Sequence, residues 1–311
     1  MGLCLKRIRP RELQPMNYAI ETRDLCRAFS GKLAVDHLSL TVEPGTFYGF
    51  LGPNGAGKST TIKMLTGLLA PSSGAIRVLG RDMLIASEAL EVKRQIGVIP
   101  ENLALFDNLT ATDYLTFVGR IHGLDRTAIR KRSGELLELL SLDKETKKLA
   151  MEYSHGMRKK LSLAAALLPN PKLLFLDEPF EGVDAVASLM IRDLLTQLTS
   201  RGATVFLTSH VLEIVQRLCT HVGIIVKGQL VVQQSMQDLL QSRTLEESFL
   251  GVAGSDAAAF TRLDWLDASP VSGRGTDVLA TASRVATAPA DEIPPNGSES
   301  SSDLDGQEYP Q

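Results

Sequence analysis

One stretch of this 311-residue sequence decides its fold: Gly52-Pro53-Asn54-Gly55-Ala56-Gly57-Lys58-Ser59. It matches the pattern Gly-x-x-x-x-Gly-Lys-Ser/Thr at every fixed position. An apolar run typical of a buried strand, Phe47–Leu51, precedes it, and a helical pattern, Lys58–Leu69, follows it. The glycines allow the backbone to wrap a phosphate with its N–H groups, and the positive end of the helix points at the same anion. The stretch therefore predicts a phosphate-binding loop in which Lys58 reaches the β- and γ-phosphates of a nucleotide and Ser59 binds Mg²⁺.

A second apolar run, Leu173–Leu176, ends in two adjacent carboxylates, Asp177 and Glu178. Open α/β sheets carry their ligand sites at the carboxyl ends of the strands, so this run would deliver Asp177 to a metal beside the phosphate loop. A carboxylate one residue further along can orient and deprotonate the water that attacks the γ-phosphate. We therefore expect Asp177 to bind Mg²⁺ and Glu178 to act as the general base.

Strand and helix patterns alternate along the chain, which predicts an α/β fold with parallel strand pairing. Further strands are expected at Tyr18–Leu25, Leu38–Val42, Ala75–Leu79, Ile96–Ile99, Thr204–Leu207 and Val222–Val226. Lys227-Gly228 is typical of a hairpin turn, here into a strand at Leu230–Val232. From about Thr110 to Leu168 the pattern is mostly helical, with a leucine-rich apolar face. A helical block inside an α/β core predicts two subdomains.

From Tyr18 to Leu250 the chain resembles the ATP-binding cassette (ABC) ATPase family. Besides a phosphate loop and an acidic strand, that family carries a signature of the Leu-Ser-Gly-Gly-Gln type upstream of the acidic strand. The corresponding place in this chain holds Tyr153-Ser154-His155-Gly156-Met157, which retains the serine and the second glycine. The resemblance implies that Ser154 and Gly156 touch the γ-phosphate bound by a partner subunit. The other three positions depart from the pattern, which bears on the rate of ATP hydrolysis and on the fit to the partner subunit.

The resemblance implies roles for further residues. His210 ends a strand at the place where the family has a histidine that contacts the γ-phosphate and the catalytic carboxylate. Asp184 matches an aspartate at the subunit contact, and Phe29 stands where an aromatic ring stacks on adenine. Glu101 replaces the family's usual glutamine, and a carboxylate oxygen also suits Mg²⁺.

The site implied by these matches has three groups of residues. Its nucleotide-binding residues are Phe29, Gly52, Pro53, Asn54, Gly55, Ala56, Gly57, Lys58, Ser59, Thr60, Glu101, Ser154, Gly156 and Asp184. Its catalytic residues are Lys58, Asp177, Glu178 and His210, and its metal ligands are Ser59, Glu101 and Asp177. ATP and Mg²⁺ are the implied ligands.

The resemblance implies a P-loop NTPase of ABC type, with an N-terminal antiparallel β subdomain and an inserted helical subdomain at about residues 102–168. We expect the ATPase domain to span residues 17–254. Residues 1–16 are predicted to be a disordered basic leader, and Met16 is a hypothetical translation start. Residues 255–311 are predicted to be a disordered, low-complexity tail, because from Val285 onward there are six acids and no base.

The implied function is that of the ATP-binding and ATP-hydrolysing subunit of a membrane transporter. Two such subunits, identical or different, would close head to tail over two nucleotides and reopen after hydrolysis. The sequence lacks an 18-residue apolar run, so a separate permease subunit would cross the membrane and provide the only membrane contact. Three scattered cysteines fit a reducing compartment, which places the protein on the cytoplasmic face of the membrane. Pro100-Glu101 and the Tyr-Ser-x-Gly-Met signature resemble bacterial export-type (ABC-2-like) ATPases.

Two other functions fit parts of the sequence. The first is a soluble ABC ATPase with a mechanical or regulatory role, but the interval from Lys58 to Ser154 has no room for the coiled coil of DNA-repair members. The second is a P-loop kinase, which requires neither the signature nor His210. A net charge of −3 argues against a dedicated nucleic-acid binder.

Overall fold

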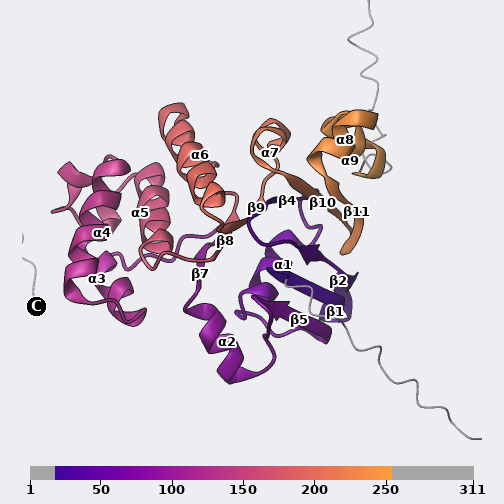
Figure 1. Cartoon of the computed structure of the whole chain (residues 1–311), viewed down its shortest axis with the longest axis horizontal. Coiled ribbons are helices and arrows are strands. Elements are labelled where there is room, and N and C mark those ends of the chain that lie inside the picture. The colour runs from indigo at the N-terminus through magenta and orange to yellow at the C-terminus, as the bar shows by residue number, and fades with distance from the viewer. Residues whose placement is uncertain (1–17, 254–311) are drawn as a thin grey trace, which may run out of the picture. The chain divides into compact units, whose positions relative to one another are not determined.

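A computed structural model describes residues 18–253. The predicted basic leader (1–16), the hypothetical start at Met16 and the predicted acidic tail (255–311) lie outside the described residues. The described part of the chain contains two sheets and a group of helices (Figure 1). In the sequence, these helices lie between two strands of the larger sheet.

The larger sheet has six strands in the order β11-β10-β4-β9-β8-β7. Their bounds are β4 (Phe47–Leu51), β7 (Ile96–Ile99), β8 (Leu173–Asp177), β9 (Thr204–Thr208), β10 (His221–Val226) and β11 (Gln229–Ser235). All of these strands except β11 pair in parallel. This confirms the parallel pairing that the alternation of strands and helices predicts. β11 returns antiparallel to β10 after Lys227-Gly228, so the predicted hairpin is also confirmed. Every residue of β4, β8 and β9 is buried, which explains their continuous apolar sequences.

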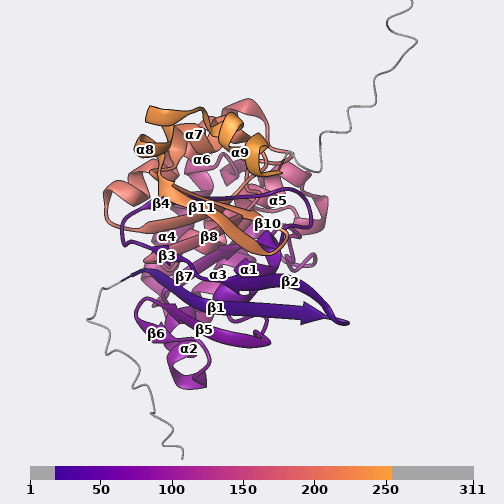
Figure 2. The ribbon, with the colours of Figure 1, turned by 90° about the vertical axis from the view of Figure 1, so that its right-hand side faces the viewer.

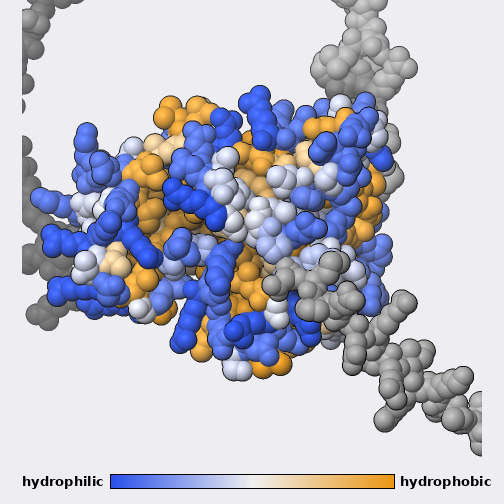
Figure 3. Space-filling model, viewed as in Figure 1, coloured by the Kyte–Doolittle hydropathy of each residue, from blue (hydrophilic) through white to orange (hydrophobic). Residues whose placement is uncertain are grey.

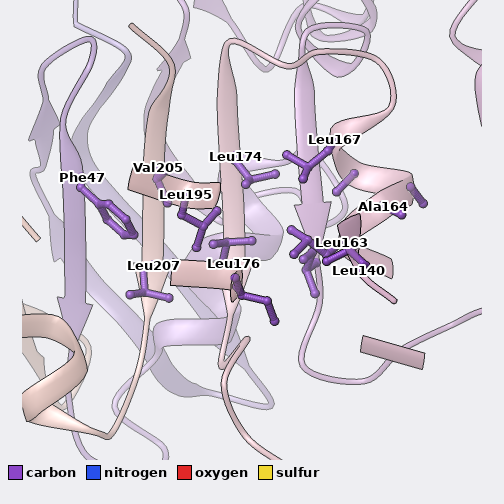
Figure 4. Close-up of a cluster of buried hydrophobic side chains, with 14 of the residues drawn as sticks. Phe47, Leu140, Leu163, Ala164, Leu167, Leu174, Leu176, Leu195, Val205 and Leu207 are labelled. Carbon is purple, nitrogen blue, oxygen red and sulfur yellow. The ribbon is translucent and has the colours of Figure 1, made fainter. Parts of the chain in front are cut away.

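Helices cover one face of this sheet. They are α5 (His155–Leu167), α6 (Ala185–Ser200), α7 (Leu212–Leu218), α8 (Met236–Ser242) and α9 (Leu245–Ala253). In Figure 4, strand residues Phe47, Leu174, Leu176, Val205 and Leu207 lie in one buried cluster with helix residues Leu163, Leu167 and Leu195. Alternate residues of the same strands, such as Tyr48 and Phe206, point to the opposite face, where α1 (Lys58–Leu65) and α2 (Ala86–Lys93) pack. Helices on both faces thus fix the strand ends that carry the site.

The smaller sheet is antiparallel throughout, and Figure 2 shows it beside the larger one. Its strands are β1 (Ile20–Phe29), β2 (Lys32–Leu38), β3 (Thr41–Val42), β5 (Ser73–Val78) and β6 (Arg81–Asp82). The order is β2-β1-β5-β6, and β3 pairs with the start of β1. This arrangement confirms the implied N-terminal antiparallel β subdomain.

Several predicted elements have other bounds in the structure, among them a strand and a helix. The single strand expected at Leu38–Val42 is two strands, because β1 is longer than expected and reverses at Ser30-Gly31 into β2, which ends at Leu38. Both turn residues have positive φ, 46° and 81°, as a tight hairpin requires. The helix expected at Lys58–Leu69 ends at Leu65, since Gly67 adopts a φ of 67°, with which a right-handed helix cannot continue.

Helices occupy the stretch that the sequence predicts to be mostly helical. α3 (Ala111–Ile121) and α4 (Arg126–Leu139) precede α5, with short 3-10 turns at Asp143–Glu145 and Ala150–Glu152. The side chains of Thr110 and Asp125 accept hydrogen bonds from N–H groups in the first turns of α3 and α4 and so cap them. Leu137 joins the core shared with α5, whereas Leu139 is 44% exposed.

Candidate nucleotide-binding site

The predicted phosphate loop lies between the buried strand β4 and helix α1. Gly55 and Gly57 have φ of 76° and 108°, which side-chain-bearing residues rarely adopt. A Cβ on Gly57 would lie 2.4 Å from the carbonyl oxygen of Ala34, and one on Gly52 would lie 2.3 Å from that of Ile225. The glycines therefore allow both the backbone turn and its close packing against neighbouring carbonyl groups. Helix α1 begins at Lys58, and the N–H groups of its first turn, which have no partner within the helix, face the loop.

Lys58 is only 7% exposed and its ammonium lies over the loop. Its Nζ donates to the carbonyl oxygens of Gly52 at 2.7 Å and Pro53 at 3.2 Å. Burial lowers the pKa of this ammonium, while the negative charges of Glu178, Asp177 and Glu101 oppose that shift. A buried cation beside the amide groups of the loop is suited to bind a phosphate.

The carboxyl ends of β8 and β9 bring together two polar residues. Asp177 and Thr208 are register partners, and the Thr208 hydroxyl donates to Oδ1 of Asp177. Asp177 is 4% exposed and Thr208 is completely buried. The hydrogen bond therefore fixes the orientation of the predicted metal ligand. Sequence reasoning missed Thr208, although a threonine ending an otherwise apolar buried strand was a usable signal.

Glu178 and His210 are in contact, as the resemblance implies. Nδ1 of His210 lies 3.0 Å from Oε2 of Glu178, and the backbone N–H of His210 donates to the same oxygen at 3.3 Å. The Glu178 side chain is 12% exposed and the His210 side chain 56%. Glu178 has a φ of 50°, an uncommon value for a residue with a side chain, and its N–H donates to the carbonyl oxygen of Thr208 at 3.2 Å. The backbone around the predicted general base is thus held in an unusual conformation.

One cavity of about 500 Å³ collects the predicted groups. Its lining includes Asn54, Gly55, Gly57, Lys58, Ser59, Thr60, Glu101, Asp177, Glu178 and His210. The Ser59 hydroxyl donates to Oε2 of Glu101 at 3.3 Å, so two of the three predicted metal ligands are adjacent. Ala34 and Glu181 also line the cavity and were missed, because neither matches a motif position.

The predicted signature residues are not brought to this cavity. Ser154 caps α5 by accepting from the N–H of Met157 at 3.3 Å, and Gly156 lies in the first turn of that helix. Ser154 is exposed, and within residues 18–253 the cavity lining includes neither Ser154 nor Gly156. Asp184 is also exposed and caps α6, and the hydrogen bond from the N–H of Ala187 lowers the pKa of its carboxyl group.

Phe29 lies at the end of β1 and is 46% exposed. The guanidinium carbon of Arg27 lies 4.7 Å from the centroid of its ring. Within the described residues, Phe29 does not line the cavity that holds Lys58. Its predicted stacking on adenine remains a prediction.

Comparisons with known proteins agree with this geometry. The sequence pattern of the ABC transporter family matches residues 35–181. The chain is 41% identical over 217 residues to the bacitracin transport ATP-binding protein BcrA of Bacillus licheniformis, covering 70% of this chain and 69% of that protein. It is 39% identical over 224 residues to the daunorubicin/doxorubicin resistance ATP-binding protein DrrA of Streptomyces peucetius, covering 72% and 67%.

A solved structure has the same fold. It is a dimeric ATP-binding cassette in a post-hydrolysis state, bound to ADP and Pi, with 21% identity and a TM-score of 0.65. The match covers 70% of this chain and 98% of that one. Taken with the phosphate loop and the groups gathered around it, these relatives show that the chain belongs to the ABC transporter family, as an ATPase subunit that powers transport.

Proposed function

We propose that the chain hydrolyses ATP in the cavity between the phosphate loop and the ends of β8 and β9, with Glu178 as the general base. One observation carries the proposal: Lys58, the adjacent pair Asp177 and Glu178, and His210 converge on that cavity from three separate segments of the sequence. Lys58 would bind the β- and γ-phosphates. Glu178 would take the proton of the attacking water, held in place by the two contacts that His210 makes to its Oε2.

The residues at the cavity suit Mg²⁺. The predicted ligands are the Ser59 hydroxyl and the carboxylates of Glu101 and Asp177, all of which line it. Mg²⁺ prefers oxygen ligands of this kind and usually binds through one or two carboxylates together with substrate phosphates. When bound, the ion would neutralise charge on the β- and γ-phosphates.

The signature residues support a site that two subunits complete. Ser154 is exposed, and Gly156 lies in the same helical turn outside the cavity. In a head-to-tail dimer, each subunit would place these residues on the nucleotide bound by the other. ATP would then favour the closed dimer through contacts made only in that state. Asp184, exposed at the start of α6, would lie at the same contact.

We propose that a separate permease subunit docks beside the helical region. None of the helices in residues 18–253 combines the length and hydrophobicity needed to cross a bilayer. A cavity of about 350 Å³, lined by Pro100, Ala104, Leu105 and Tyr114 among others, lies next to an aromatic group formed by Phe106, Tyr114 and Phe117. Phe106 is 53% and Phe117 40% exposed. Figure 3 shows hydrophobic residues reaching the surface among hydrophilic ones, including over the helical region.

The names of two relatives support a role in the transport of small molecules. One acts in bacitracin transport and one in resistance to daunorubicin and doxorubicin. We propose that this chain drives export of a small molecule from the cytoplasmic face of the membrane, with membrane contact through the permease alone.

The variant Glu178→Gln tests the catalytic proposal. It keeps the shape of the side chain and a hydrogen-bonding group but removes the base. We expect turnover to fall by about 10²–10⁴-fold, with the dissociation constant of ATP unchanged within about threefold. Steady-state phosphate release and equilibrium binding of a fluorescent ATP analogue measure the two quantities. Turnover near that of the wild type would refute Glu178 as general base.

Co-purification tests whether the chain associates with a separate permease subunit. The full-length tagged chain, expressed in its own cells, should be recovered from detergent-solubilised membranes with an integral membrane protein. Recovery with ribosomes or DNA instead would favour the soluble mechanical ATPase.

A further inference from the structure

Lys159 is a buried lysine that none of the predicted motif positions explains. It lies in α5, in the turn that follows Gly156, and is 3% exposed. Lysines are almost never fully buried unless their charge is paired or hydrogen-bonded, because the ammonium loses its hydration. Burial accordingly lowers the pKa of Lys159, against the opposing charges of Glu181, Glu178 and Glu101. Such a side chain requires a structural or functional reason.

The contacts of Lys159 lie on the segment of the predicted general base. Its Nζ donates to the backbone carbonyl oxygen of Glu178 at 2.7 Å and also to that of Glu181. These two carbonyls bracket a tight turn, in which the N–H of Glu181 donates to the carbonyl oxygen of Glu178 at 3.4 Å. One ammonium therefore holds both ends of the turn that follows β8.

The other side of Glu178 is held from β9. The Glu178 N–H donates to the carbonyl oxygen and to the hydroxyl of Thr208, each at 3.2 Å. The residue is thus fixed at its amide by Thr208 and at its carbonyl by Lys159. Its φ of 50° costs energy, and such a conformation persists only where the surroundings enforce it.

We infer that Lys159 is a positioning residue, which holds the Glu178 backbone so that its carboxylate reaches the attacking water. The inference rests on the proposed role of Glu178 as general base. Lys159 does not line the nucleotide cavity within residues 18–253, so it acts through Glu178 and not on the phosphates. Misplacing a catalytic group by about 1 Å can cost on the order of 100-fold in rate, whereas substrate affinity depends on the phosphate loop, which stays intact.

The test compares Lys159→Met with Arg132→Met in the full-length chain. Arg132 is a matched control because its Nη1 also donates to a distant backbone carbonyl, that of Leu168, at 2.9 Å within the helical region. For Lys159→Met we expect kcat to fall by about 10–100-fold with KM for ATP within about threefold of the wild type. For Arg132→Met we expect a lower Tm with kcat unchanged, which separates lost stability from lost positioning.

Lys159→Arg provides the rescue. Its guanidinium keeps the charge and can donate to both carbonyls, so kcat should return to within about fivefold of the wild type. If Lys159→Met does not fold, Lys159→Gln takes its place, since its shorter neutral amide cannot hold both carbonyls and should give the same fall in kcat. A kcat within about twofold of the wild type for either neutral variant, or a rise in KM with kcat unchanged, would overturn the inference.

Glu178→Gln, assayed in parallel, separates this inference from the proposed function. If Glu178→Gln abolishes turnover and Lys159→Met does not lower it, only the role of Lys159 is wrong. If Glu178→Gln retains turnover, the general base has been misassigned and both proposals fail.

Discussion

Two regions carry the predicted nucleotide-binding residues, the cavity at the phosphate loop and the signature at the start of α5. They differ in how many of their groups the fold of one chain brings together. Around the phosphate loop, Lys58, Asp177, Glu178 and His210 line one cavity; Lys58 donates to the loop, and His210 contacts Glu178. At the start of α5, Ser154 and Gly156 have the implied sequence but lie outside that cavity. One region is assembled by the fold of a single chain, and the other presents its groups outward.

Under the proposed function, a single chain would hold a complete site for binding ATP but only half of a site for turnover. A second subunit would supply the missing half. Isologous pairing about a two-fold axis would place each exposed signature on the opposite cavity, and so would complete two sites at once. Substitutions in the two regions should therefore have different consequences, and the following variants test that contrast.

Lys58→Ala should have the largest effect, because it removes the buried cation from the complete half of the site. We expect kcat/KM for ATP to fall by about 10³-fold or more, and ATP binding to be lost together with turnover. Equilibrium binding of a labelled ATP analogue measures this directly. Retained affinity would mean that the phosphates lie elsewhere.

Ser154→Arg should disrupt the exposed signature at the start of α5 and leave the phosphate-loop cavity intact. A bulky cation at the start of α5 would clash with the nucleotide bound in the cavity of the opposite subunit, so we expect kcat to fall by about 10²–10³-fold. The affinity of the single chain for ATP should stay within about threefold of the wild type, since Ser154 does not line its cavity. An equal loss of ATP affinity and turnover would contradict the proposed difference between the phosphate-loop cavity and the signature.

His210→Ala should have an intermediate effect. It removes the imidazole that lies 3.0 Å from Oε2 of Glu178. We expect kcat to fall by about 10–100-fold with KM little changed, because the base loses an orienting contact while the phosphate loop is intact. The His210 side chain is 56% exposed, so thermal unfolding should show a nearly unchanged Tm. A large fall in Tm would indicate a structural role instead.

Glu101→Gln should have the smallest effect, since it restores the residue usual in the family and retains a metal-binding oxygen. We expect turnover to change by less than about tenfold and the Mg²⁺ concentration for half-maximal activity to rise, because one negative charge beside the ion is lost. A Mg²⁺ titration of ATPase activity makes the measurement. An unchanged Mg²⁺ requirement would remove Glu101 from the metal ligands.

Much of this arrangement follows from local sequence. The phosphate loop, the strand that ends at Asp177 and the hairpin at Lys227-Gly228 each combine a turn or charge signal with a clear apolar run, and each forms as predicted. The strand at Ile96–Ile99 has the predicted bounds, because the polar Gln95 before it and Pro100 after it limit the apolar run.

Other features depend on contacts between distant segments. The position of Thr208 at the end of an apolar strand marks it as a candidate, but its partner Asp177 follows only from register pairing across two strands. Lys159 gives no local signal, since the carbonyls that it binds belong to a loop after β8. The turn at Ser30-Gly31 was missed because the last residues of β1, Arg27, Ala28 and Phe29, are partly or fully exposed and give no regular apolar pattern, while the backbone stays extended.

Mixing two inactive variants shows directly whether two subunits share each ATPase site. Lys58→Ala and Ser154→Arg chains should each lack ATPase activity, yet a mixed dimer would contain one intact phosphate loop opposite one intact signature. If the subunits associate at random and exchange freely, we predict recovery of about a quarter of the wild-type activity in an equimolar mixture. Activity in the mixture no higher than in either variant alone would contradict a site shared between two subunits.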